Sequence, residues 1–259
     1  MDEITAEYAA DQLAAPVALR AVARVRIAAK TDLGRVRENN EDKYEFYIPD
    51  EEALLATRGQ VFVVCDGMGG HAAGQIASEL AAKTFIDVYL HHPSEDPALA
   101  LRAGVQAADR FVTDVGRTIP GRRGMGTTLS SLVLLQEAGL IAHVGDSRVY
   151  RLRGGDLELL TTDHTWVEQA VQQGVISPEE AKTHLHRHVL LRAIGAEDFV
   201  VEPDVFPIDV QAGDVFLLCS DGVMNHVEDD QIEEILLANG PSEAAWKIVG
   251  AALQARTAR

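Results

Sequence analysis

The sequence predicts an α+β fold in which two antiparallel β-sheets pack face to face and pairs of α-helices flank them. Apolar segments typical of strands come in a block between residues 129 and 160. Segments with helical periodicity follow one another in pairs, near residues 72–115 and near residues 229–253. Because strands and helices do not alternate strictly, a sandwich is favoured over a parallel sheet covered by crossover helices.

Composition places the chain among globular proteins, because 47% of its 259 residues are hydrophobic and 24% are charged. The net charge of −17 opposes binding to nucleic acid and to anionic membranes, since both need clustered Lys and Arg. Cys65 and Cys219 lie in apolar segments and suit a reducing cytoplasm. Neither a signal peptide nor a run of ~20 apolar residues is found. We therefore expect a cytoplasmic monomer with one domain at residues 25–259 after an N-terminal extension at residues 1–24.

The expected strands are short apolar runs rich in β-branched residues. They lie at residues 25–29, 61–65, 129–135, 140–144, 149–152, 157–160, 200–210 and 215–219. The run at 61–65 is apolar without alternation, so both of its faces should be covered. The short connections between the strands of the 129–160 block favour antiparallel pairing.

The expected helices show apolar residues at every third or fourth position, or a recognisable first turn. They lie at residues 72–90, from 97 to about 115, at 165–173, from 178 onward, at 229–238 and at 242–253. Asp96-Pro97 provides an N-cap and a proline at the first helical position. Ser177 to Glu180 forms a Ser-x-x-Glu capping box. The two helices between residues 165 and 192 form a small insertion between strands.

Two aspartates follow apolar strands and precede glycine. Asp66 ends the run Val61–Cys65, and Asp221 follows the run Val215–Cys219. A buried carboxylate without a partner costs several kcal/mol, so each should meet a cation or a hydrogen-bond donor. If the two strand ends lie side by side, an all-oxygen site would favour Mg²⁺ or Mn²⁺ over zinc. The alternative interpretation is two unrelated Asp-Gly turns.

Five motifs occur in a defined order along the chain. They are Arg37…Asn40-Glu41-Asp42, Asp66-Gly67-Met68-Gly69-Gly70-His71, Gly126-Thr127-Thr128, Gly145-Asp146-Ser147-Arg148 and Ser220-Asp221-Gly222. In order and spacing they resemble the bacterial metal-dependent serine/threonine protein phosphatases of type 2C, over roughly residues 25–254. The resemblance implies a β-sandwich of two antiparallel sheets flanked by helix pairs, with a two-metal centre at one edge.

The resemblance also implies which residues hold Mn²⁺ or Mg²⁺. Asp66 would bridge two ions, the Gly67 carbonyl would bind one of them, and Asp221 would bind the other. Asp146 would hold a third, looser ion. Two such ions lower the pKa of a bridging water, so that the resulting hydroxide can attack phosphorus without a nucleophilic side chain.

Three residues of the first loop would act around the ions, by the same resemblance. Glu41 and Asp42 would hold metal-bound waters, and Arg37 would bind the substrate phosphate through its guanidinium fork. Without the motif, Arg37 would be interpreted as a surface arginine in an ion pair. The implied reaction is hydrolysis of phosphoserine and phosphothreonine in proteins modified by bacterial Ser/Thr kinases.

The insertion at residues 165–192 matches the variable flap of bacterial members, which is thought to affect substrate access. His184, His186 and His188 alternate within it, as metal ligands could, although such solvated histidines are more often ordinary surface residues. The general acid is not identified, because Met68 stands where animal members carry a histidine proposed for that role.

One family motif is not matched. The family carries Asp-Asn-(Ile/Val)-Thr at the start of a last strand, and its aspartate binds a metal. This sequence stops at Arg259, where that motif would begin. Either the chain is truncated or it has lost this ligand and the last strand. Weak activity would follow from the missing ligand, so the alternative is a weakly active or inactive regulator that binds phosphoproteins. A further alternative is hydrolysis of small phosphate esters by the same centre.

Overall fold

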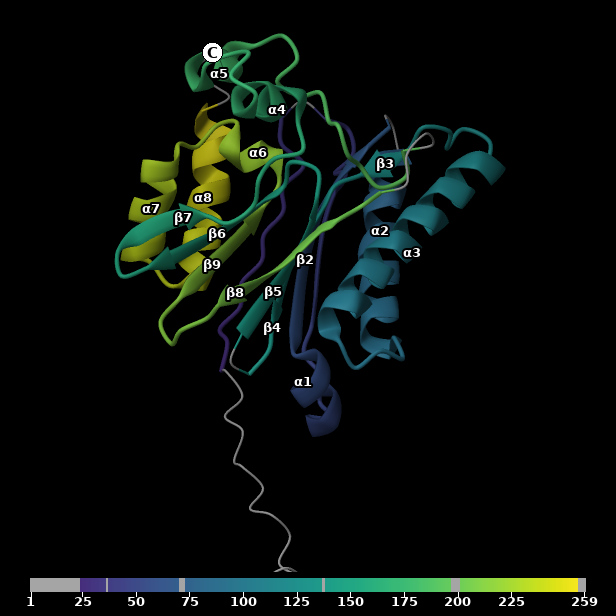
Figure 1. Ribbon diagram of the computed structural model, residues 1–259. Coiled ribbons are helices and arrows are strands. Elements are labelled where there is room, and N and C mark those ends of the chain that lie inside the picture. The colour runs from purple at the N-terminus through teal and green to yellow at the C-terminus, as the bar shows by residue number, and fades with distance from the viewer. Residues whose placement is uncertain (1–23, 36, 70–72, 137, 197–200, 256–259) are drawn as a thin grey trace, which may run out of the picture.

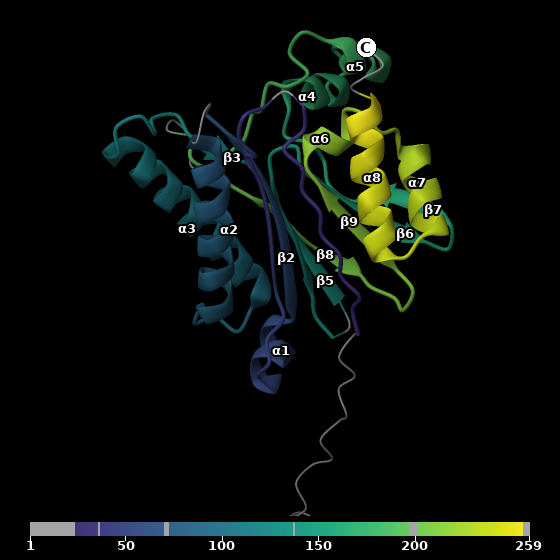
Figure 2. The same cartoon turned by 180° about the vertical axis from the view of Figure 1, so that it is seen from behind.

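The fold is a sandwich of two antiparallel β-sheets with a helix pair outside each sheet (Figures 1 and 2). The computed structural model describes residues 24–35, 37–69, 73–136, 138–196 and 201–255. The two helix pairs are α2 (Ala73–His91) with α3 (Pro97–Thr118), and α7 (Asp229–Ala238) with α8 (Pro241–Ala255). The α+β sandwich expected from the sequence is confirmed.

The larger sheet contains the buried strand expected at residues 61–65. Its strands, in spatial order, are β1 (Asp42–Tyr47), β2 (Gln60–Met68), β4 (Leu129–Leu134), β5 (Ala138–Val144) and β8 (Asp204–Asp209), and β3 (Gly126–Thr127) pairs with the end of β2. Val61, Val63 and Cys65 of β2 are at most 1% exposed and pack in the core beneath α2 and α3. Phe62 faces the other way, into the contact with the second sheet. Both faces of β2 are therefore covered, which explains its unbroken apolar run.

The smaller sheet is a three-stranded antiparallel unit. Its spatial order is β7 (Asp156–Leu159), β6 (Arg148–Arg153) and β9 (Val215–Cys219). Leu152 and Leu217 pack outward against Ile232 of α7 and Ile248 of α8. On the inner face, this sheet meets Leu132 and Ile141 of the larger sheet through Val149 and Phe216. Full burial of each such side chain contributes about 1.5–3 kcal/mol.

Helix α3 shows how the local sequence sets its ends and its buried face. Asp96 caps it, since its Oδ1 accepts a hydrogen bond of 2.8 Å from the Ala98 N–H. Leu101 and Val105 are fully buried against α2, as their spacing predicts. Gly104 lies on the same face, where an added Cβ would come within 3.0 Å of the Phe85 carbonyl oxygen. The two helices can therefore approach closely at this point.

The insertion at residues 165–192 forms a separate flap above the sandwich (Figure 1). Its helices are α4 (Trp166–Gln172) and α5 (Pro178–Thr183), and the predicted capping box of Ser177 and Glu180 is present. A bridge between Thr165 and Leu190 joins the two ends of the flap. Trp166 packs on His184, with ring centroids 4.8 Å apart.

The structure corrects several expected boundaries. Residues 25–29 were expected as a strand and form none, because in the described chain this segment pairs with neither sheet. The strand expected at 200–210 begins only at Asp204, just after Pro203, which has no N–H for a ladder. Strand β2 continues to Met68, past the expected end at Cys65, because β3 pairs with it there. The elements β1, α1 (Glu52–Arg58) and α6 (Asp221–Met224) were not expected.

Two expectations concern the N-terminal extension and the membrane. The N-terminal extension expected at residues 1–24 lies almost wholly outside the described residues. Among the helices of the described part, none combines the length and apolar character needed to cross a bilayer.

Candidate metal centre

The fold brings carboxylates from four segments to one end of the sandwich. Asp42, the first residue of β1, lies directly opposite Asp66 of β2 in the antiparallel register. Asp221 begins α6 immediately after β9, and Asp146 lies in the turn between β5 and β6. All three interact electrostatically with Asp66. The convergence of Asp66 and Asp221 expected from the sequence is therefore present, and two unrelated turns are excluded.

Burial and mutual repulsion raise the pKa values of these acids. The pKa of Asp66 rises to about 9, first through burial and then through the charges of Asp42, Asp221 and Asp146. Burial followed by the charge of Asp221 raises the pKa of Asp146 to about 7. Burial also raises the pKa of Asp42, although the hydroxyl of Ser220 opposes the change by donating a 2.7 Å hydrogen bond to Oδ2. The centre therefore carries more negative charge than its protein surroundings compensate.

Glu41 lies at the side of this cluster with half of its carboxylate unpaired. Its Oε2 accepts a 2.7 Å hydrogen bond from Arg37, whose side chain is 66% exposed. Its Oε1 is buried and has no hydrogen-bond partner among the described residues. An added Cβ on Gly74 would come within 2.5 Å of that oxygen, so glycine is needed where α2 approaches Glu41. A buried carboxylate oxygen without a donor is the kind of atom that a cation or its water ligand satisfies.

The residues present fit divalent cations that prefer oxygen ligands. The candidate donors are carboxylates from separate segments together with the carbonyl of Gly67. In the ranges that the structure describes, no three His, Cys, Asp or Glu side chains are already gathered closely enough to hold a metal ion, so these carboxylates must draw together when a cation binds. Oxygen donors combined with excess negative charge suit Mn²⁺ or Mg²⁺.

Hydroxyl residues that sequence reasoning gave no role hold Asp66 in place. The backbone N–H of Asp66 donates to Thr128 Oγ1 at 2.9 Å, and its carbonyl accepts from the Thr128 N–H and from Thr127 Oγ1, each at 2.9 Å. The Thr128 hydroxyl also lies 2.6 Å from Ser147 Oγ, next to Asp146. The adjacent Thr127-Thr128 pair before an apolar strand was the available signal, because such hydroxyls can bond to neighbouring backbone.

Comparison with known proteins identifies the family of this centre. A model of the protein phosphatase 2C family matches residues 35–250. The chain belongs to the protein phosphatase 2C family. The resemblance inferred from the five motifs is therefore confirmed.

Relatives of this phosphatase 2C chain include serine/threonine phosphatases. It is 36% identical to the serine/threonine protein phosphatase PstP of Mycobacterium tuberculosis over 230 residues, which are 89% of this chain and 42% of that protein. The chain thus spans less than half the length of PstP. It is 38% identical to the serine/threonine phosphatase stp of Listeria monocytogenes over 212 residues, covering 80% of this chain and 81% of that protein. A crystal structure of the PstP catalytic domain with two manganese ions superposes with a TM-score of 0.75 at 36% identity, covering 89% of this chain and 92% of that one.

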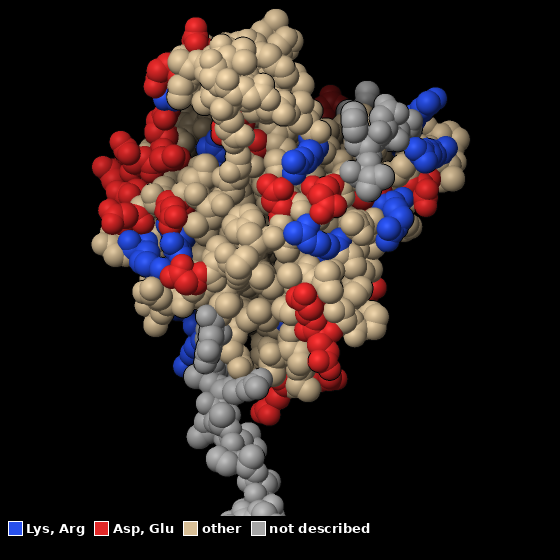
Figure 3. Space-filling model, in the orientation of Figure 1, with Lys and Arg blue, Asp and Glu red and all other residues tan. Residues whose placement is uncertain are grey.

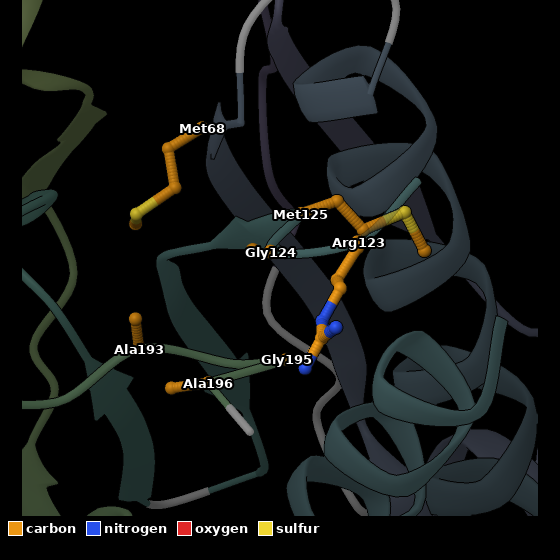
Figure 4. Close-up of a pocket in the computed structure, with 8 residues that line it drawn as sticks. Met68, Arg123, Gly124, Met125, Ala193, Gly195 and Ala196 are labelled. Carbon is orange, nitrogen blue, oxygen red and sulfur yellow. The ribbon is translucent and has the colours of Figure 1, made fainter. Parts of the chain in front are cut away.

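A small pocket lies beside the phosphatase 2C centre. It has a volume of about 320 Å³ and lies between Met68, two residues after Asp66, and the segment from Ala193 to Ala196. Figure 4 shows Met68 reaching toward Ala193 and Arg123 reaching toward Gly195 across this space. On the face of the molecule drawn in Figure 3, acidic side chains gather over α7 and β7, and basic ones near the end of α3. Arg123, just after α3, contributes positive charge to the lining of the pocket.

Proposed function

We propose that this chain hydrolyses phosphoserine and phosphothreonine in proteins, with Mn²⁺ or Mg²⁺ as cofactor. The observation that supports it best is the convergence of Asp42, Asp66, Asp146 and Asp221, which leaves Asp66 with a pKa raised to about 9 in the absence of a cation. Membership of the phosphatase 2C family and the two manganese ions of PstP support the same function.

In this proposal the ligands come from the ends of three strands. Asp66, the Gly67 carbonyl and Asp221 would together hold two ions, and Asp146 would hold a further, looser ion. When bound, the ions lower the pKa of water at the centre so that it can attack phosphorus in line. The hydroxyls of Thr127 and Thr128 fix the backbone of Asp66, so the strand end that carries its carboxylate is held in place before any ion binds.

Arg37 and the two acids after it act on substrate and water. Arg37 is well exposed and donates one hydrogen bond to Glu41. Its other N–H groups can therefore donate to the oxygens of a substrate phosphate. Glu41, with its unpaired Oε1, and Asp42, held by Ser220, accept hydrogen bonds from water at the centre. None of these three groups forms a covalent bond with phosphorus.

The test is release of phosphate from a phosphothreonine peptide by the full chain in Mn²⁺ and in EDTA. We expect Mn²⁺-dependent turnover that Asp66→Asn abolishes, because a neutral amide cannot hold two cations together. Asp87→Asn is the matched control, since Asp87 is an exposed acid on α2 that pairs only with His91 in the described structure. Turnover by Asp66→Asn close to that of the unmodified chain would refute the proposal.

Two rival functions are distinguished when the same experiment also measures peptide binding and hydrolysis of an aryl phosphate. A regulator that binds phosphoproteins would retain the phosphopeptide without releasing phosphate. A hydrolase of small esters would turn over an aryl phosphate far faster than the peptide. We also propose that its substrates are proteins phosphorylated by bacterial Ser/Thr kinases and that it acts as a cytoplasmic monomer. Binding to nucleic acid or to a membrane is not part of the proposal, in agreement with the net charge of −17.

A further inference from the structure

Buried His164 holds the turn that carries Asp146. The backbone N–H of His164 donates to the Gly145 carbonyl at 2.8 Å, and the Gly145 N–H donates to His164 Nδ1 at 3.1 Å. Gly145 has φ of +105°, and an added Cβ would come within 2.5 Å of Thr128 Cγ2. The turn is therefore fixed on one side by packing against Thr128 and on the other by these two hydrogen bonds.

The other edge of the imidazole contacts Asp204, which forms an ion pair with Arg192. His164 Nε2 lies 3.0 Å from Asp204 Oδ2, and Asp204 Oδ1 accepts a 2.9 Å hydrogen bond from Arg192. Because Nδ1 accepts from Gly145, the ring proton of neutral His164 must be on Nε2, where it donates to Asp204. Asp204 and the Gly145 N–H thus favour the same tautomer, in which Nε2 carries the proton and Nδ1 accepts.

The ion pair also connects this histidine to the flap. Arg192 is the last residue of the flap, and the Leu191 N–H donates to the His164 carbonyl at 2.8 Å. Neighbouring His143 has its own partners, with Nδ1 2.9 Å from Ser130 Oγ and Nε2 2.9 Å from the Thr162 carbonyl. His143 packs on the ring of His164, with centroids 4.7 Å apart, and so limits its rotation.

We propose that His164 is a positioning residue for the Asp146 metal ligand, and that Asp204 and Arg192 keep it in the tautomer that performs this task. The inference rests on the proposed function only in assigning Asp146 to a metal. The two hydrogen bonds to Gly145 fix the turn from which the Asp146 side chain extends. Loss of a partner bonded directly to a metal ligand typically weakens metal affinity about 10- to 100-fold, so loss of this indirect support should lie at the lower end of that range. In the described structure His164 bonds to the turn of Asp146 and to the Asp204–Arg192 pair, and not to Asp66 or Asp221, so its effect should fall on the ion that Asp146 holds.

Two substitutions separate the two edges of the imidazole. In His164→Asn the side-chain oxygen takes the place of Nδ1 and can still accept from Gly145. In His164→Gln the amide nitrogen takes the place of Nε2 and can donate to Asp204, but nothing accepts from Gly145. Titration of the full chain with Mn²⁺ alone, with Asp146→Asn to identify the affected ion, should show about 10-fold weaker binding of that ion in His164→Gln. His164→Asn should stay within about threefold of the unmodified chain.

The role of Asp204 has a spectroscopic test that requires no turnover. The ¹⁵N spectrum of the His164 imidazole should show protonated Nε2 in the unmodified chain and a mixture of tautomers in Asp204→Ala. His91→Gln, an exposed histidine on α2, is the matched control and should leave Mn²⁺ binding unchanged.

Several results would overturn the inference. Equal Mn²⁺ affinities in His164→Gln and His164→Asn would do so, as would equal weakening of every Mn²⁺ site by His164→Gln. An unchanged tautomer in Asp204→Ala would remove the role of Asp204. A chain that binds Mn²⁺ as expected but releases no phosphate would instead refute the proposed function and leave the positioning role standing.

Discussion

Asp66→Asn should stabilise the metal-free protein while removing its response to Mn²⁺. The folded pKa of Asp66 is about 9, against an ordinary value of 3.8. A raised carboxyl pKa gives stability that is complete below pH 3.8 and is lost as the pH rises through about 9. At pH 7 the loss is at most about 4 kcal/mol, at about 1.36 kcal/mol for each pH step above the ordinary pKa. Because Asp42, Asp221 and Asp146 interact with Asp66 and share this cost, we expect a gain of about 1–3 kcal/mol.

The measurement is thermal and denaturant unfolding at pH 7 in EDTA and in Mn²⁺. For a domain of this size, 1 kcal/mol corresponds to about 2–4 °C in Tm. The unmodified chain should gain stability on addition of Mn²⁺ by mass action, and Asp66→Asn should gain little. At pH 4 the two proteins should differ much less, because Asp66 of the unfolded chain is then partly protonated as well and folding has little proton uptake left to drive. A metal-free Asp66→Asn that is less stable at pH 7, or that retains the full Mn²⁺ effect, would refute the reasoning.

Four further predictions follow from the same geometry. Arg37→Ala should raise KM for a phosphopeptide about 10-fold or more with a smaller effect on kcat, because a charge-assisted hydrogen bond contributes about 1.5–3 kcal/mol; a change in kcat alone would contradict phosphate binding by Arg37. Mn²⁺ affinity should rise with pH between 6 and 9, because Asp146 and Asp66, with pKa values of about 7 and about 9, must release protons to bind it. Calorimetry in buffers of different ionisation enthalpy counts those protons. An affinity that does not change with pH would contradict the raised pKa values. Gly195→Ala should lower the free energy of unfolding by about 1–3 kcal/mol, since φ is +84° and the new Cβ would meet Val112 Cγ1 at 2.5 Å; an unchanged denaturation midpoint would show that the turn relaxes. Deletion of residues 177–188 should change the preference among protein substrates more than aryl phosphate hydrolysis, and equal losses on both would show that the flap is needed to build the centre.

The sequence could predict those elements whose own pattern determines them. The boundaries of β9 and α7 match the expectation at both ends, because an unbroken apolar run and an amphipathic period are local signals. The segment at residues 25–29 has the composition of a strand, yet a strand exists only where a neighbour accepts and donates its backbone hydrogen bonds. Strand β1 was missed for the opposite reason. Its charged and aromatic residues form a weak strand signal, and pairing with β2 at the sheet edge decides its conformation.

The same distinction applies to the metal centre. Asp66 and Asp221 could be found from sequence, because each follows an apolar run and precedes glycine. The contribution of Asp42 depends on register, which places it directly opposite Asp66 across the β1–β2 ladder. Like charges directly opposite each other in a sheet are destabilising, and burial makes this pair worse. The folded protein tolerates these two facing acids because Ser220 donates a hydrogen bond to Asp42 and because protons neutralise the cluster until a cation replaces them. The repulsion that weakens the metal-free fold is therefore the source of its affinity for Mn²⁺ or Mg²⁺, so substitutions that remove it should raise stability and lower metal binding together.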